Sequence, residues 1–335
     1  MRTRTLGPSG IEASVVGLGT WAMGGWMWGG TDEAASIDAI HAAIDAGINL
    51  IDTAPIYGFG TSETIVGRAI RQRRDEVVLA TKCSMVCDPS LGEFIFKSSS
   101  LGPDPDGLIS IHICLEPDSI RREVEGSLKR LQTDYIDLYQ THWQSESTPI
   151  ADAMAALMEL KQQGKIRAVG VCNASDAQLE QYRQAGTLDA DQEKYSMLDR
   201  GFDDARLPYC REQNVAVLGY SPLVLGLLTG KIGADRKFNV GDLRLTHPRF
   251  TKDNLQRIAA MLERFRPIAE GHQITLAQLA IAWTVHQPGL THALCGARNR
   301  QQAIENAAAG DVGLSTEELA AMERAIAEYA VSAGE

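Results

Sequence analysis

The stretch Leu50-Ile51-Asp52-Thr53-Ala54-Pro55-Ile56-Tyr57-Gly58 decides the fold. It begins as a short apolar run, which is typical of a buried parallel strand. The carboxylate of Asp52 and the phenol of Tyr57 follow at the end of that strand. Later apolar runs end in the same way: residues 77–81 lead into Lys82, residues 135–141 into His142, and residues 166–171 into Cys172 and Asn173. We therefore expect the reactive side chains that follow several strands to lie together at one end of the sheet, which we call the mouth.

Strand and helix signals alternate along nearly the whole chain. The opening segment, residues 6–16, contains a Pro8-Ser9-Gly10 turn that predicts a β-hairpin. Amphipathic stretches lie between the later apolar runs, and residues 32–46 repeat apolar side chains at helical spacing before Gly47. Strands are expected at residues 15–20, 50–54, 77–81, 135–141, 166–171, 189–195, 215–220 and 293–296. This order predicts an α/β fold, a (β/α)8 TIM barrel, with residues 1–335 in a single domain.

Two segments break the regular period, and we expect them to decorate the barrel as long strand-end loops. Residues 84–116 are rich in proline, glycine and serine and are far longer than an ordinary connection, as functional lids often are. Because this segment follows the strand that leads into Lys82, it is expected over the mouth. Residues 223–251 follow the seventh strand, and the glycines there allow the backbone to approach a ligand closely.

The composition restricts the classes of function. A formal net charge of -11 argues against a nucleic-acid or anionic-membrane surface, although an acidic chain can hold a local basic pocket for a small anionic cofactor. No run of about 18 apolar residues occurs, and the first residues lack the apolar core of a signal peptide, so the cytoplasm is the expected compartment. The six scattered cysteines are interpreted as reduced thiols, and the histidines lack metal-ligand spacing, so no metal is expected.

The strand ends group four reactive side chains, because TIM barrels carry their active sites at the carboxyl ends of the strands. A buried Asp52 beside Lys82 would form a paired charge, and the ammonium would favour the phenolate of Tyr57. His142 is suited to orienting a substrate carbonyl. Together these groups suit reversible protonation of a carbonyl oxygen while a hydride reaches its carbon, which requires a cofactor.

These motifs resemble those of the aldo-keto reductase family from near the first residue to about Leu319. Residues 50–58 resemble the family's strand-two signature, Ala80-Thr81-Lys82 its strand-three lysine, and residues 134–143 its strand-four histidine segment. The Gly-Ala-Arg sequence at residues 296–298 and the short tail most resemble the bacterial branch of inositol-operon-type reductases and potassium-channel β-subunit relatives. The resemblance implies that Tyr57 is the general acid, with Asp52 and Lys82 tuning it and His142 positioning the carbonyl.

The resemblance also implies a nicotinamide cofactor across the second half of the mouth. Asn173 and Gln192 would hold its carboxamide and Tyr220 would stack on its ring, whereas Cys172 departs from the family's usual serine. Arg298 would clamp a 2′-phosphate at a helix start, which favours NADPH over NADH. The implied cofactor-binding residues are Thr20, Trp21, Asp52, Cys172, Asn173, Gln192, Tyr220, Ser221, Pro222, Leu223, Gly226, Leu228, Lys231, Gly296, Ala297, Arg298, Gln302, Glu305 and Asn306. The substrate-binding residues would be Trp21, Tyr57, His142 and Trp143.

Structural alternatives exist for each residue taken alone. Asp52 and Lys82 could form an ordinary ion pair, and Arg298 could be a surface charge, but the joint pattern favours a site. The tryptophan-rich segment at residues 21–30 has two interpretations, a hydrophobic substrate wall or packing of the first loop against the barrel. Trp21 is the better pocket candidate, whereas Trp26 and Trp28 are expected to meet a partner subunit or to shield the loop.

The predicted function is an NADP-dependent aldo-keto reductase, an alcohol:NADP oxidoreductase. The alternative is a nicotinamide-sensing binding protein with negligible turnover, and a third is a metal-dependent barrel hydrolase. The sequence leaves open the substrate, whether sugar, polyol, ring ketone or small aldehyde, as well as the reaction direction and assembly into a homo-oligomer.

Overall fold

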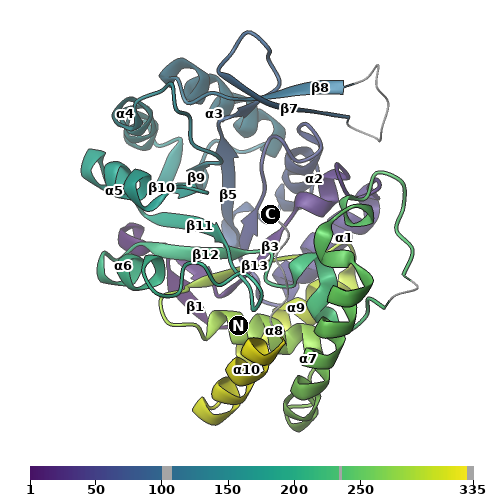
Figure 1. Ribbon diagram of the computed structural model, residues 1–335. Coiled ribbons are helices and arrows are strands. Elements are labelled where there is room, and N and C mark those ends of the chain that lie inside the picture. The colour runs from purple at the N-terminus through teal and green to yellow at the C-terminus, as the bar shows by residue number, and fades with distance from the viewer. Residues whose placement is uncertain (100–107, 234–235, 330–335) are drawn as a thin grey trace.

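The computed structural model describes residues 1–99, 108–233 and 236–329, and its centre is a closed barrel of eight parallel strands (Figure 1). These strands are β3 (Val16–Gly19), β4 (Leu50–Asp52), β5 (Val78–Cys83), β9 (Ile136–Thr141), β10 (Ile166–Cys172), β11 (Ala190–Lys194), β12 (Ala216–Tyr220) and β13 (His292–Gly296). Neighbouring strands follow one another along the chain, and β13 pairs with β3 to close the cylinder. The predicted (β/α)8 TIM barrel is confirmed.

Helices surround the barrel (Figure 1). They are α1 (Glu33–Asp45), α2 (Thr61–Ile70), α3 (Pro117–Leu131), α4 (Ile150–Gln162), α5 (Asp176–Ala185), α6 (Arg206–Glu212), α7 (Lys252–Gly271), α8 (Leu276–Val285), α9 (Arg300–Ala308) and α10 (Thr316–Glu328). The sequence of helix α3 explains why a helix forms there. Pro117 occupies its first turn, and Ile120, Val124 and Leu131 lie on one buried face.

The predicted N-terminal hairpin is present, with strands slightly earlier in the chain than residues 6–16, and it packs against the barrel interior. It consists of β1 (Thr3–Thr5) and β2 (Glu12–Ser14), joined by a 3₁₀ turn. Leu6 and Ile11 of the hairpin cluster with barrel side chains such as Leu138. The guanidinium of Arg4 donates to the carbonyl of Leu290, just before β13 begins, at 2.7 Å. The hairpin therefore covers the amino ends of the strands and leaves the carboxyl ends for chemistry.

The first long insertion is not a loop throughout, which corrects the sequence expectation for residues 84–116. Three of its stretches form an antiparallel sheet in the order β6-β8-β7, comprising β6 (Met85–Val86), β7 (Glu93–Ser99) and β8 (Leu108–Ile113). Apolar side chains alternate along β8, and Ile111 is fully buried, which is the pattern of a half-buried strand. Residues 100–107, which include the Gly102-Pro103-Asp104 sequence of this insertion, lie outside the described residues.

The second insertion, residues 223–251, runs beside the loop that follows β3. It contains 3₁₀ turns at Val224–Thr229, Leu243–Leu245 and Pro248–Phe250. The backbone amide of Leu243 donates to the carbonyl of Met27 at 3.0 Å, and Trp28 forms an isolated bridge with Asp242. Two segments far apart in the sequence thus meet at the mouth. Within the described residues, no helix is long and apolar enough to cross a membrane.

Candidate active site

A buried ion pair joins the ends of the adjacent strands β4 and β5. The ammonium of Lys82 lies 2.7 and 2.8 Å from the two carboxylate oxygens of Asp52 and also donates to the carbonyl of Thr53 at 2.9 Å. Both charged side chains are buried. Burial alone would lower the pKa of Lys82, but the carboxylate of Asp52 outweighs it and raises that pKa above its usual value. The lysine is therefore a permanent cation at the base of the mouth.

The phenol of Tyr57 lies above this pair. Its hydroxyl is 3.5 Å from the ammonium of Lys82. Gly58 shapes the turn that presents it, since its φ is +65° and a Cβ there would lie 2.1 Å from the carbonyl oxygen of Gly24. Burial raises the pKa of Tyr57 to about 12, although Lys82 pulls it down. The sequence predicted that Lys82 would favour the phenolate of Tyr57, and Lys82 does lower the pKa of this phenol. Burial raises the pKa by more, so the phenol keeps its proton.

His142 follows β9 and faces the same phenol. Its ring meets the ring of Tyr57 edge-on, with centroids 5.7 Å apart, and its backbone amide donates to the carbonyl of Cys83 at 2.9 Å. Burial, aided by the cation of Lys82, lowers the pKa of His142 well below its ordinary value, so the imidazole is neutral near pH 7. Its Nδ1 atom is buried and has no hydrogen-bond partner, so a polar atom beside the phenol is still free to form a hydrogen bond.

Asn173 and Gln192, the two expected carboxamide ligands, both lie beside these groups. The side-chain nitrogen of Gln192 donates to Asp52 at 2.9 Å. Asn173 donates to the carbonyl of His142 at 2.9 Å and accepts from the hydroxyl of Tyr220 at 2.9 Å. Each amide therefore already belongs to a hydrogen-bonded chain that reaches the catalytic candidates.

One cavity of about 840 Å³ extends from these groups to the start of α9. Most of the predicted cofactor and substrate residues line it: Thr20, Trp21, Asp52, Tyr57, His142, Trp143, Asn173, Gln192, Tyr220, Ser221, Pro222, Leu223, Gly226, Lys231, Gly296, Arg298, Gln302, Glu305 and Asn306. Cys172, Leu228 and Ala297 do not line it. Each of these three side chains is buried beneath the cavity wall, with at most 1% of its surface exposed.

The sequence reasoning placed residues 84–116 over the mouth without naming which of them line this wall, and it named no polar residue of the second insertion beyond Lys231. The apolar part of the wall includes Met85, Ile95, Phe96 and Ile113 from the small antiparallel sheet, and its polar part includes Arg236, Arg244 and Asn299. Trp26 and Trp28 line the cavity as well, and Trp26 packs in parallel with Phe96 and donates to Ser98 at 2.9 Å. The alternation of apolar residues along β8 was the available signal for the sheet.

The far end of the cavity carries positive charge. The guanidinium of Arg298 donates to the carbonyls of Trp28 and Gly30 at 3.2 and 2.8 Å, whereas Lys231 pairs with Glu305 at 3.0 Å. Since the partners of Arg298 are neutral carbonyls, its charge is not cancelled by them. Asn299 caps α9 by accepting from the backbone amide of Gln302 at 3.0 Å, so a helix N-terminus lies beside this charge.

Comparison with known proteins identifies the family. The family model described as the aldo/keto reductase family matches residues 15–327.

The chain belongs to this family.

This aldo/keto reductase is similar to the NADH-specific methylglyoxal reductase of Escherichia coli, with 43% identity over 321 residues that cover 94% of this chain and 95% of the relative. A glycerol dehydrogenase from Gluconobacter oxydans has the same fold, with a TM-score of 0.85, 38% identity and coverage of 98% of this chain and 95% of that one. An aldo/keto reductase from Klebsiella pneumoniae, solved with NADP and acetate, matches with a TM-score of 0.72 and 28% identity over 97% and 95% of the two chains.

The family places this aldo/keto reductase among the oxidoreductases that use nicotinamide cofactors for carbonyl chemistry. In the part of the chain that the structure describes, no group of three or more His, Cys, Asp or Glu side chains is arranged to hold a metal ion.

Proposed function

We propose that this aldo/keto reductase uses NADPH to reduce the carbonyl of a small aldehyde or ketone to an alcohol, with Tyr57 as the general acid. The observation that carries the proposal is the hydroxyl of Tyr57, which keeps its proton and lies 3.5 Å from the ammonium of Lys82. It lies in the same cavity as the cationic end near Arg298. A proton donor and an anion-binding region therefore share one continuous space.

Each side chain has a separate task in this proposal. Tyr57 donates its proton to the carbonyl oxygen, and the adjacent ammonium of Lys82 stabilises the phenolate that remains. Asp52 holds that ammonium in place through both carboxylate oxygens. His142, being neutral, offers a hydrogen bond to the carbonyl oxygen without competing as an acid. A reduced nicotinamide, when bound, supplies the hydride that these side chains cannot.

The cavity wall fits a nicotinamide dinucleotide. Asn173, Gln192 and Tyr220 lie next to the catalytic candidates and would hold the nicotinamide end. Ser221, Pro222, Leu223, Gly226 and Lys231 would hold the pyrophosphate, and Gly296, Arg298, Gln302, Glu305 and Asn306 the adenosine. The charge of Arg298, whose hydrogen-bond acceptors are neutral carbonyls, and the start of α9 support NADPH, because a 2′-phosphate adds negative charge there. The named specificity of the Escherichia coli relative makes NADH the competing cofactor.

The substrate side of the wall favours small uncharged carbonyls. Trp21, Ile56, Met85 and Phe96 line it with apolar surface, and Trp143 lies at its rim with 43% of its surface exposed. Two relatives carry names for three-carbon oxygenated substrates, methylglyoxal and glycerol. We therefore propose three-carbon aldehydes and ketones as the first substrates to test.

The deciding experiment is a titration of purified protein with NADPH and NADH, followed by tryptophan fluorescence. Methylglyoxal, glyceraldehyde, dihydroxyacetone and larger carbonyls are then added while the absorbance of the reduced cofactor is recorded. Binding followed by oxidation is the expected result. Binding without oxidation across the whole panel would instead favour the cofactor-sensing alternative, and no binding of either cofactor would refute the proposed cofactor site.

Replacing Arg298 with alanine is expected to weaken NADPH binding selectively. Loss of one charged hydrogen-bond partner of a phosphate corresponds to about 1.5–3 kcal/mol, or roughly 10- to 150-fold in the dissociation constant. NADH affinity should change by less than about threefold on the same scale. Arg300→Ala is the matched control, because Arg300 starts α9 and pairs with Asp38 without lining the cavity. Equal losses for both cofactors would contradict the phosphate role.

The pH dependence should differ between the two reaction directions. Because Tyr57 stays protonated up to a pKa of about 12 and His142 is neutral, the reduction kcat is expected to be flat from about pH 6 to about pH 9. Alcohol oxidation requires the phenolate of Tyr57, so its rate should rise with pH across the same range. Initial rates with saturating cofactor test this, and an inflection in reduction near the ordinary histidine pKa would contradict the neutral role of His142.

A further inference from the structure

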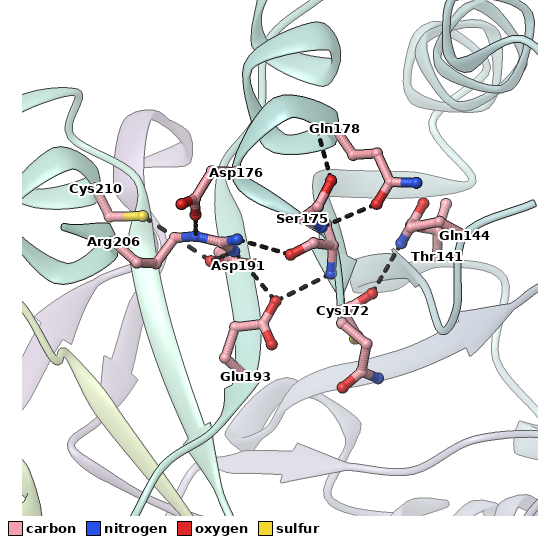
Figure 2. Close-up of polar contacts among 12 residues, drawn as sticks. Thr141, Gln144, Cys172, Ser175, Asp176, Gln178, Asp191, Glu193, Arg206 and Cys210 are labelled. Atoms are coloured by element: carbon pink, nitrogen blue, oxygen red, sulfur yellow. Dashed lines mark hydrogen bonds and ion pairs between the residues drawn. The ribbon is translucent and has the colours of Figure 1, made fainter. Parts of the chain in front are cut away.

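A buried charged cluster lies behind the strand end that carries Asn173. It consists of Asp191 and Glu193 from β11, Arg206 from α6, and Asp176 at the start of α5 (Figure 2). Asp191, Glu193 and Arg206 are each less than 5% exposed. None of the four residues lines the cavity. Strand alternation explains the separation, since Gln192 points to Asp52 inside the barrel while its two neighbours point to the helices.

Arg206 connects this cluster to the backbone directly after Asn173. Its guanidinium donates to Asp191 at 3.0 Å, to Asp176 at 2.6 Å and to the carbonyl of Ala174 at 2.7 Å. Glu193 accepts from the backbone amide of Ala174 at 3.0 Å and from Arg206 at 3.2 Å. Both backbone polar groups of Ala174 are therefore held by the side chains of one network.

The residues on either side of Asn173 and Ala174 are fixed as well. The side-chain nitrogen of Gln144 donates to the carbonyl of Cys172 at 2.8 Å. Ser175 forms a capping box with Gln178 at the start of α5. Figure 2 shows these contacts on the side of the strand end away from Arg206. The backbone around Asn173 is thus held from two directions.

This restraint matches the backbone conformation of Asn173. Its φ is +53°, in the left-handed region, which costs most non-glycine residues about 1–2 kcal/mol and which asparagine tolerates better than the others. Residues in this region are common at binding sites. Here the left-handed residue is the one whose side chain contacts both Tyr220 and His142.

Core stability alone does not account for a buried charged network, because well-packed apolar side chains are often as stabilising. Burial and the neighbouring Asp191 carboxylate raise the pKa of Glu193 to about 9, so Glu193 carries a proton near neutral pH. Arg206 then faces one buried negative charge, on Asp191, and the exposed carboxylate of Asp176. The cluster can hold the Ala174 peptide without a large charge imbalance.

We propose that Arg206, together with Glu193, is a positioning residue that sets the Ala174 peptide and thereby aims the side chain of Asn173 at the nicotinamide carboxamide. The inference rests on the proposed function, in which Asn173 is a carboxamide ligand. It adds that the grip on the nicotinamide end depends on a residue that touches neither cofactor nor substrate.

A double-mutant cycle tests this role through binding rather than turnover. The dissociation constants of NADPH and of 2′,5′-ADP, which lacks the nicotinamide, are measured for the wild type, Asn173→Ala, Arg206→Met and the double variant. Each single variant should weaken NADPH binding about tenfold, the loss of one good hydrogen bond, and the double variant should be little weaker than either. Binding of 2′,5′-ADP should stay unchanged in all of them.

Two further variants keep the test decisive if Arg206→Met folds poorly. Arg206→Lys retains the cation but not the span from Asp176 to Ala174, and it should show the same selective loss. Arg74→Met is the matched control, because Arg74 also pairs with a buried carboxylate, Asp137, and with backbone carbonyls, but beside the first residues of β9. It should leave both ligands bound normally.

The outcomes separate the inference from the proposed function. A selective NADPH loss in Asn173→Ala with normal binding in both Arg206 variants would overturn the positioning role and leave the function standing. Fully additive losses, or equal losses of NADPH and 2′,5′-ADP, would also overturn it. Unchanged NADPH binding in Asn173→Ala would remove the carboxamide role on which the inference depends.

Discussion

Replacing Tyr57 with phenylalanine should lower the kcat for carbonyl reduction by about 10²–10⁴-fold, the usual contribution of a positioned general acid. The substitution removes only the hydroxyl, which is 3.5 Å from the ammonium of Lys82 and which donates the proton in the proposed function. NADPH binding should change by less than about threefold, because the ring remains. Steady-state rates with a carbonyl substrate and a fluorescence titration with NADPH provide the two measurements.

The control for this experiment is Tyr135→Phe. Tyr135 immediately precedes β9, its ring packs under the guanidinium of Arg74, and it does not line the cavity. The same chemical change there should leave kcat unaltered. Full activity in the Tyr57 variant would refute the general-acid role, whereas loss of activity together with NADPH binding would indicate a damaged site rather than a missing proton.

Replacing Lys82 with methionine should reduce both turnover and stability. The carboxylate of Asp52 would remain buried without its cation, and breaking a buried pair in this way typically costs about 3–5 kcal/mol. Loss of the ammonium also removes the charge that stabilises the phenolate of Tyr57, so kcat should fall by about 10²-fold or more. Urea unfolding and steady-state kinetics measure the two effects independently.

The double variant Asp52→Asn with Lys82→Met separates the two effects. It removes both charges together, so it should recover part of the lost stability while kcat stays low. Recovery of turnover in the double variant would show that the pair serves only the fold. Wild-type stability in the single Lys82→Met variant would show that Asp52 does not depend on its cation.

The barrel could be predicted because its strands are short apolar runs that end in polar residues. The run at residues 135–141 became β9, and the parallel arrangement then placed His142 at the same rim as Asp52 and Lys82. The small sheet formed by β6, β7 and β8 was missed because its proline- and glycine-rich surroundings suggested loop throughout. Its apolar alternation was weaker than those turn signals.

The details of the site could not be predicted from the sequence because they depend on side-chain direction and burial. Gln192 donates to Asp52, and Arg298 binds the carbonyls of the loop after β3, contacts that no spacing in the chain encodes. The net rise in the pKa of Tyr57 comes from burial outweighing a neighbouring cation, a balance set only by the packed structure. Arg206 comes from α6, whose approach to β11 is likewise a product of folding.

The closed order of the barrel strands has a consequence for how the protein becomes active. Asp52, Lys82, His142, Gln192 and Tyr220 each come from a different strand or strand end, and the cylinder is completed only when β13 pairs with β3. All five lie between residues 52 and 220, so the site exists only when the successive barrel strands β4, β5, β9, β10, β11 and β12 are assembled side by side.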